Sequence, residues 1–323
     1  MAEASPKKIV GRLAPSPTGA LHLGNARTFM IAWLNVRSQG GKLVLRMEDL
    51  DHPKNKAGAD RQALEDLRWL GFDWDEGPDI GGANGPYVQT RRIEIYRQAV
   101  TKLSECGLAY PCICTRRDID AGQSAPHEGE MLHYKGTCRN RFKTYSEALL
   151  AANGRLPAWR FNTGTSAPIQ INDLFAGKYE QDVAKYCGDF VLARDADGAG
   201  YMLASVLDDA AMGITEIVRG DDLLPATPAQ ILIAKALKLP IPSHIHVPLV
   251  VGADGKRLAK RHGDTKISTY REAGVKPEQI IGALAASCGW ADEDEQISLN
   301  ALMPRYNLHT IPHKPFVWDR ELN

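Results

Sequence analysis

The apolar pattern at the start of the chain changes period twice. Residues 9–13 form a short apolar run that predicts a strand, and residues 25–37 carry apolar side chains at helical spacing. Residues 42–51 alternate like a second strand and end in acidic side chains. Strand, helix and strand in this order predict a βαβ unit of a parallel sheet. Ligands bind beyond the carboxyl ends of such strands, where Glu48, Asp49 and Asp51 lie, although a solvated turn explains three acids equally simply.

The helical spacing and the strand spacing of apolar residues both recur further along the chain. Helical spacing predicts helices over residues 59–70, 91–106, 227–237 and 276–288, and a last one near 298–306. Short strands are expected at residues 159–161, 169–171 and 190–193, parallel-sheet character over 201–209 and 213–222, and a buried strand at 246–251. These elements predict an α/β fold, with a change of composition after residue 106 that marks an inserted domain.

Composition narrows the class of protein. The 323 residues are 44% hydrophobic and can bury a core for two or three domains. Lys plus Arg and Asp plus Glu both number 39, so any surface for nucleic acid must be a local patch. The sequence contains no signal-peptide pattern and no run of membrane-spanning length, and we expect a cytoplasmic protein without a membrane partner. Six cysteines are too few for a disulfide scaffold and indicate metal binding or core packing.

Residues 12–25 have the composition of a nucleotide-binding turn. Pro15 and Pro17 restrict the loop, and Gly19 and Gly24 allow its backbone to approach a ligand closely. The following helix would direct free amide groups at a phosphate, with His22 at its mouth. A turn without any ligand is the alternative for a cluster of glycine and proline alone.

Residues 256–263 form a second, basic motif flanked by glycines. Two cations, Arg257 and Lys260, stand about one helical turn apart. Such a loop can close over a nucleotide and neutralise charge that develops on its phosphates. A solvated basic loop is the alternative.

A third group of residues has the chemistry of a metal site. Cys112 and Cys114 are followed by Tyr134 and Cys138, so three thiolates and a phenolate could hold a tetrahedral zinc ion. His133 is a rival fourth ligand. Free cysteines in a core would give the same pattern without any metal.

Together, the two loop motifs resemble the signatures of class I aminoacyl-tRNA synthetases. The glutamyl branch is indicated by residues 12–28, 46–51, 207–209 with 213–220, and 260–263, and the resemblance runs from about residue 8 to the C-terminus. It implies a Rossmann-type parallel-sheet domain, an inserted zinc-containing α+β domain and a small C-terminal helical region. The implied ranges are 1–106 and 195–251 for the two halves of the Rossmann domain, 107–194 for the insertion, and 252–323 for the basic ATP loop and a truncated stem-contact region.

The resemblance also implies roles for individual residues. Those that would hold L-glutamate are Arg12, Ala14, Ser16, Glu48, Tyr201 and Arg219. Those that would bind ATP with its Mg²⁺ are Pro15, Thr18, Gly19, His22, Gly24, Asn25, Arg257 and Lys260, with His22 and Lys260 as the catalytic pair. The set Cys112, Cys114, Tyr134 and Cys138 is typical of the zinc site of glutamyl-queuosine tRNA(Asp) synthetases. The basic motif departs from the family, because Arg257 and Ala259 replace its usual lysine and serine.

The RNA acceptor is inferred from the length of chain after the basic loop. Only residues 264–323 remain, too few for the anticodon-binding domain of a full glutamyl-tRNA synthetase. We therefore expect a monomer that attaches glutamate to queuosine in the anticodon loop of tRNA(Asp). A short or truncated glutamyl-tRNA synthetase acting on tRNA(Glu), and a non-catalytic RNA-binding paralogue, are the alternatives. The residues that could contact RNA, or form an ordinary exposed face, are Arg139, Arg141, Lys143, Arg160, Tyr145 and Trp159.

Overall fold

The structure is a computed structural model that describes residues 8–120, 133–164, 166–195, 198–256, 258 and 265–319. Its N-terminal segment forms β1 (Val10–Leu13), α1 (Leu23–Arg37) and β2 (Lys42–Leu45). The two strands are parallel, with Val10 opposite Lys42 and Leu13 opposite Leu45. The predicted βαβ unit is therefore confirmed.

The start of α1 and the end of β2 both differ from the predicted boundaries. Helix α1 begins two residues early because His22 caps it: the Asn25 amide donates to His22 Nδ1 at 3.4 Å, and Asn25 Oδ1 accepts from the His22 amide at 3.3 Å. Strand β2 ends at Leu45 because the backbone then pairs with the first motif, where the Glu48 amide donates to the Pro15 carbonyl at 2.9 Å. This pairing holds Glu48 against the nucleotide-binding turn.

A second strand, helix and strand lie beside the first unit. They are β8 (Glu216–Gly220), α8 (Thr227–Leu237) and β9 (Ser243–Val247). Strands β8 and β9 are parallel, and Arg219 is the register partner of His246. The Thr215 amide donates to the Val10 carbonyl at 2.8 Å, which holds β8 next to β1. The carboxyl ends of β1 and β8 consequently point the same way.

The prediction of sheet structure for residues 201–209 is wrong. They form helix α7 (Tyr201–Ala211). A short apolar run does not distinguish a buried strand from a buried helix, but the buried side chains of Leu203, Ala204 and Asp208 recur at helical spacing. Asp208 is buried because it faces cationic partners on other elements, which no local pattern reveals.

Proline shortens two other predicted elements. The strand expected at 246–251 is interrupted by Pro248, which has no amide proton, and resumes as β10 (Val250–Val251) in parallel with β11 (Phe316–Val317). The helix expected near 298–306 is α11 (Leu299–Leu302), which passes at Pro304 into a 3₁₀ turn. Four further helices are α2 (Ala59–Trp69), α3 (Ile93–Glu105), α9 (Ile267–Glu272) and α10 (Pro277–Ala286).

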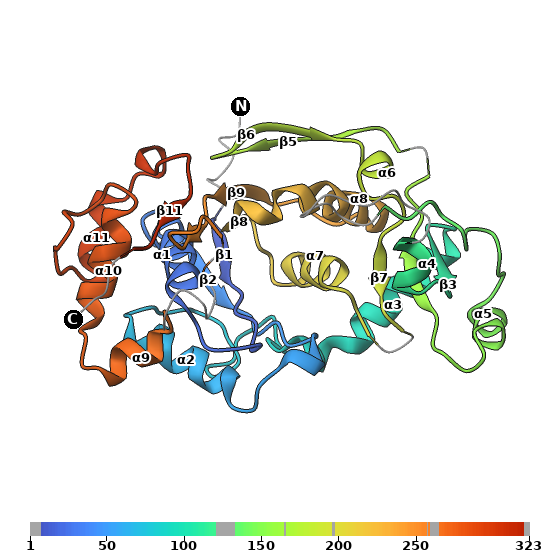
Figure 1. The fold of residues 1–323 in the computed structure, drawn as a ribbon, viewed down its shortest axis with the longest axis horizontal. Coiled ribbons are helices and arrows are strands. Elements are labelled where there is room, and N and C mark those ends of the chain that lie inside the picture. Colours follow the sequence, from blue (N-terminus) through green and yellow to red (C-terminus); the bar gives the residue numbers. More distant parts are fainter. Residues whose placement is uncertain are drawn as a thin grey trace.

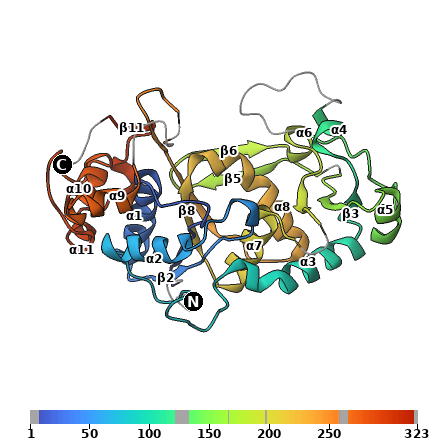
Figure 2. The same ribbon diagram turned by 60° about the horizontal axis from the view of Figure 1, so that its bottom comes forward.

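The range predicted as an insertion holds a group of short elements that share a hydrophobic core with α3, α7 and α8. An antiparallel sheet consists of β3 (Ala109–Cys112), β4 (Ala158–Phe161) and β7 (Val191–Ala193), and the helices are α4 (Arg116–Asp120), α5 (Tyr145–Ala151) and α6 (Val183–Tyr186). A hairpin of β5 (Ile169–Asp173) and β6 (Gly177–Gln181) extends from this group back toward β9 (Figure 1). In Figure 2, the N-terminal unit and the C-terminal helices lie at one end of the molecule, and β3 and α5 lie at the other end.

Among the described helices, none combines the length and the apolar character that crossing a membrane requires.

One buried carboxylate of the core predicts a pH dependence of stability. Burial alone would raise the pKa of Glu76, but hydrogen bonds from Lys42, Tyr87 and Asn84 lower it to about 2. A carboxyl with a depressed folded pKa stabilises the protein above its unfolded value, and this contribution is lost as pH falls through the folded value. We expect Glu76→Gln to lower the free energy of unfolding at pH 7, and the difference from wild type to shrink between about pH 4.3 and pH 2. Urea unfolding at several pH values measures it.

Glu65 on α2 is exposed and provides a control for the substitution. The Glu65→Gln variant should keep the wild-type free energy of unfolding at pH 7. A Glu76→Gln variant whose deficit stays constant down to pH 2 would contradict the prediction.

Candidate active site

A cavity of about 560 Å³ opens at the carboxyl ends of β1 and β8, beside the first turn of α1. Every described residue that was predicted to bind glutamate or ATP lines it, namely Arg12, Ala14, Pro15, Ser16, Thr18, Gly19, His22, Gly24, Asn25, Glu48, Tyr201 and Arg219. Arg257 and Lys260 lie outside the described residues. Segments that are far apart in the sequence therefore meet around a single cavity.

Among the groups predicted to bind glutamate, two guanidinium groups and one carboxylate line this cavity. Arg12 on β1 is 8% exposed, and its Nη1 donates to the Val218 carbonyl at 2.9 Å. Burial raises the pKa of Glu48, while Arg46 and Arg12 oppose that rise. Arg46 is completely buried behind Glu48, with its Nη2 at 3.0 Å from Glu48 Oε1. Such a set of charges suits a ligand that carries both carboxylate and ammonium groups.

Arg219 on β8 is held from behind by three side chains. Its Nε donates to His246 Nε2 at 3.0 Å, and its Nη2 donates to Thr227 Oγ1 at 2.8 Å and to Gln230 Oε1 at 2.7 Å. Its Nη1 lies 3.5 Å from the hydroxyl oxygen of Tyr201 on the cavity side. The guanidinium is thus fixed in one orientation, with Nη1 as the group nearest the cavity.

The three acidic residues that follow β2, Glu48, Asp49 and Asp51, do not face the cavity together. Glu48 alone lines the cavity. The Asp49 carboxylate accepts hydrogen bonds from the amide and the hydroxyl of Thr90 at 2.9 and 2.6 Å, and Asp51 pairs with Lys54 at 2.7 Å. Asp51 also pairs with Arg194 at 3.3 Å, so Asp49 and Asp51 contact other segments of the chain and neither lines the cavity.

The predicted nucleotide-binding turn leads into α1 at the other side of the cavity. Gly24, Asn25 and Thr28, all in the first turns of α1, line it. A Cβ atom at Gly24 would lie 3.1 Å from the His22 ring, so a larger residue would displace the capping imidazole. The N-terminus of α1 is a suitable position for a phosphate group because its amides carry partial positive charge.

The segment that follows the basic motif is hydrogen-bonded to the first motif. The Leu23 amide donates to the Thr265 carbonyl at 3.1 Å, and the Ile267 amide donates to the Leu21 carbonyl at 2.9 Å. On the preceding side, Val250 of β10 lines the cavity. These contacts connect the two halves of the predicted ATP site across more than two hundred residues of sequence.

Asp222 also lines the cavity, and the sequence reasoning did not assign it to the site. It follows Arg219 by three residues, directly after the end of β8. The rule that ligands lie beyond the carboxyl ends of parallel strands would have found it, had the boundary of β8 been known.

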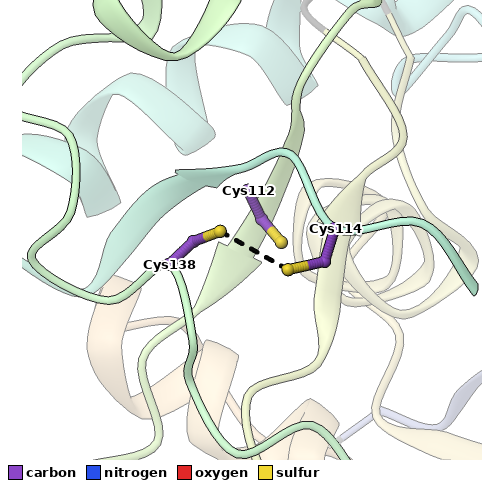
Figure 3. Close-up of side chains that lie close together, drawn as sticks. All are labelled: Cys112, Cys114 and Cys138. Carbon is purple, nitrogen blue, oxygen red and sulfur yellow. Dashed lines mark hydrogen bonds between the residues drawn. The ribbon is translucent and has the colours of Figure 1, made fainter. Parts of the chain in front are cut away.

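The three cysteines predicted to bind metal converge (Figure 3). The sulfur atoms of Cys112, Cys114 and Cys138 lie within 4.8 Å of one another, and Cys114 Sγ is 3.6 Å from Cys138 Sγ. Sulfur atoms around a tetrahedral zinc ion with bonds of about 2.3 Å are roughly 3.8 Å apart, so the cluster has the dimensions of a zinc site. These three residues could therefore hold zinc.

Of the two proposed fourth ligands, the tyrosine faces the cluster. The Tyr134 hydroxyl oxygen is 3.3 Å from Cys112 Sγ and 3.5 Å from Cys114 Sγ. His133 Nε2 instead lies 2.9 Å from the carbonyl oxygen of Ala184. The other cysteines play no part in the cluster: Cys187 and Cys288 are buried and Cys106 is exposed.

The residues suggested as an RNA-contacting face differ in how accessible they are. Arg139 pairs with Asp189 at 2.7 Å, and Arg160 is only 7% exposed, with its guanidinium 3.9 Å from the centre of the Tyr134 ring. Arg160 therefore belongs to the surroundings of the cysteines and is not available to RNA, which corrects its assignment. Arg141 and Lys143 are exposed. Nearby, the rings of Tyr145 and Trp159 stack with their centroids 5.4 Å apart.

Comparison with known proteins places this geometry in a family. Residues 8–314 match the family of class I tRNA synthetases (E and Q), catalytic domain. The chain is 46% identical over 310 residues to a glutamyl-Q tRNA(Asp) synthetase of Symbiobacterium thermophilum, and the match covers 95% of each chain. It is 39% identical to a glutamate–tRNA ligase of Carboxydothermus hydrogenoformans, covering 95% of this chain and 64% of that ligase.

A solved structure shares the fold. A glutamate tRNA ligase from Elizabethkingia meningosepticum, crystallised in complex with its amino acid, superposes with a TM-score of 0.82 at 28% identity. The superposition covers 97% of this chain and 67% of that one. The chain therefore belongs to the class I tRNA synthetase family (E and Q) and, within it, to the glutamyl-Q tRNA(Asp) synthetases.

Proposed function

We propose that this chain activates L-glutamate with ATP and transfers the glutamyl group to queuosine in the anticodon loop of tRNA(Asp). The convergence of the predicted glutamate and ATP residues on one cavity carries this proposal. It is further supported by the similarity over nearly the whole length of glutamyl-Q tRNA(Asp) synthetases. Under this proposal, the residues predicted to bind glutamate and ATP each have a role in the reaction.

In the activation step, Arg12 and Arg219 bind the carboxylates of glutamate and Glu48 binds its ammonium group. An oxygen of the α-carboxylate attacks the α-phosphorus of ATP, a new P–O bond forms, and the bond to pyrophosphate breaks. The N-terminus of α1, His22 and the basic motif with Lys260 stabilise the charge on the phosphates, and Mg²⁺ enters with ATP. No covalent bond to the protein is needed, because catalysis consists of positioning and charge stabilisation.

In the transfer step, a nucleophilic group of queuosine attacks the carbonyl carbon of glutamyl-adenylate and AMP leaves. We assign residues 107–194 to an inserted domain that carries one structural zinc ion on Cys112, Cys114, Tyr134 and Cys138. Exposed Arg141 and Lys143 are the cations of that domain that we propose for contact with RNA phosphates. The two parts of the Rossmann domain, 1–106 and 195–251, supply the cavity.

The acceptor is tested with the full chain, labelled glutamate and transfer RNA from cells that make or lack queuosine. We expect glutamate-dependent pyrophosphate exchange without RNA, and label on tRNA(Asp) only when queuosine is present. The second candidate, glutamylation of tRNA(Glu), is favoured by the 38–40% identity to glutamate–tRNA ligases.

The possible results separate the candidate functions. Equal labelling of tRNA(Glu) in both preparations would replace the first proposal with the second. If neither exchange nor labelling occurs while RNA still binds, the chain is a binding protein instead of a ligase.

A further inference from the structure

Behind Arg219 lies a chain of hydrogen bonds that the proposed reaction does not use. Arg219 Nε donates to His246 Nε2 at 3.0 Å, and His246 Nδ1 lies 2.6 Å from Asp173 Oδ2. The side chains of His246 and Asp173 are completely buried. Because a guanidinium can only donate, His246 Nε2 must be an acceptor, which places the imidazole proton on Nδ1 facing Asp173.

Three different segments supply these groups. Arg219 and His246 are register partners on β8 and β9, while Asp173 is the last residue of β5. The hairpin that contains β5 extends from the range of the insertion toward β9 (Figure 1). Asp173 Oδ1 accepts from the amides of His246, Phe175 and Ala176 at 3.2, 3.0 and 2.7 Å, so its own position is fixed.

We propose that His246, oriented by Asp173, is a positioning residue that fixes the Arg219 guanidinium for a substrate carboxylate and thereby sets the preference for glutamate over glutamine. The inference rests on the proposed function. The hydrogen bonds to His246, Thr227 and Gln230 occupy the inner side of Arg219 and leave Nη1 nearest the cavity. The side-chain carboxylate of glutamate offers two charged oxygens to this donor, whereas the carboxamide of glutamine offers one neutral oxygen, so the fixed guanidinium binds glutamate more strongly.

Loss of the imidazole acceptor would leave the guanidinium held from behind only through Nη2, by Thr227 and Gln230. Arg219 could then tilt and point Nη1 away from the substrate. The effect should concern glutamate and not ATP, because His246 makes no described contact with the residues around the mouth of α1. It should also lower discrimination, since a less well oriented guanidinium loses more of its charge-assisted hydrogen bond to a carboxylate than of its weaker bond to a carboxamide. The hairpin that bears Asp173 would then be part of the amino-acid site, although it belongs to the insertion.

The test uses His246→Leu, which fills similar volume without an acceptor, and His246→Gln, whose amide oxygen can accept from Arg219 while its NH₂ donates to Asp173. Pyrophosphate exchange is measured with glutamate, glutamine and ATP titrated separately, and glutamate binding by calorimetry. We expect His246→Leu to raise the KM for glutamate roughly 10- to 100-fold, as for a lost hydrogen bond to a charged group. The KM for ATP should change less than about twofold, the glutamate-to-glutamine ratio should fall, and His246→Gln should recover much of the loss.

His244 provides a matched control on the same strand. Its ring stacks on that of His246 with centroids 5.9 Å apart and is 6% exposed, yet it makes no side-chain hydrogen bond within the described residues. His244→Leu should therefore leave the KM for glutamate unchanged. If His246→Leu does not fold, Asp173→Asn is measured in its place and should raise the same KM.

Several results would overturn the inference. These are an unchanged KM for glutamate in His246→Leu, equal changes in the KM for ATP, equal effects in His244→Leu, or no recovery in His246→Gln. A wild-type chain that is inactive and does not bind glutamate would overturn the proposed function and this inference with it. A wild-type chain that is active beside an insensitive His246→Leu would overturn this inference alone.

Discussion

Replacement of Arg219 by alanine is expected to lower kcat/KM for glutamate in pyrophosphate exchange by roughly 10²- to 10³-fold. Removing one partner of a buried, hydrogen-bonded charge pair costs about 2–5 kcal/mol, and each 1.4 kcal/mol is about a factor of ten. Arg219 is 5% exposed and lines the cavity, so water cannot replace it efficiently. The loss should lie mainly in the KM for glutamate, while the KM for ATP stays near the wild-type value.

Arg37 allows this result to be distinguished from a loss of stability. It also makes several hydrogen bonds, to Asp73 and Asp75, but it lies outside the cavity. The Arg37→Ala variant should retain the KM of the wild type for glutamate even if its melting temperature falls. An Arg219→Lys variant keeps the charge but loses the fork geometry, and should fall between alanine and wild type. Comparable kinetic losses in Arg37→Ala and Arg219→Ala would remove Arg219 from the glutamate site.

The second large effect is expected at the cysteine cluster. Replacing Cys138 with serine should reduce bound zinc from about one ion per chain to almost none and lower the melting temperature by several degrees. Structural zinc binding contributes about 10–16 kcal/mol in small zinc domains, and that free energy is coupled to folding of the surrounding chain. Metal analysis by mass spectrometry, the absorption of the cobalt-substituted protein and thermal unfolding measure these effects.

Three variants identify the ligand set. Tyr134→Phe should weaken metal binding by more than the roughly 10- to 100-fold typical of losing an outer-shell partner. His133→Ala should not, because the His133 ring is directed at the Ala184 carbonyl. Cys106→Ser removes an exposed thiol outside the cluster and should leave the zinc content unchanged. A wild-type protein that contains no zinc after growth with zinc, and binds no cobalt, would refute the site.

Local patterns predicted helices that carry end signals or two different faces. Helix α8 occupies the predicted range 227–237 and has Pro228 in its first turn, α1 ends before the Gly40–Gly41 stop, and α2 is amphipathic. The pattern failed for α7, because a short apolar run does not distinguish a buried helix from a buried strand. Asp208 and Asp209 are buried there with partners from distant segments, among them Arg46, directly after β2, and Arg92, directly before α3. No window of the sequence around residue 208 contains those partners.

The sequence by itself determined the family and indicated the chemistry of the two sites, because the two loop motifs and the cysteine spacing are short segments with characteristic residue types. Only the tertiary structure decided which acid after β2 faces the cavity and that Arg160 is buried. It also brought Asp173 and His246 behind Arg219. The physical reason is distance along the chain: such side chains are selected by contacts between segments separated by tens to hundreds of residues, and these contacts form only when the sheets and helices pack.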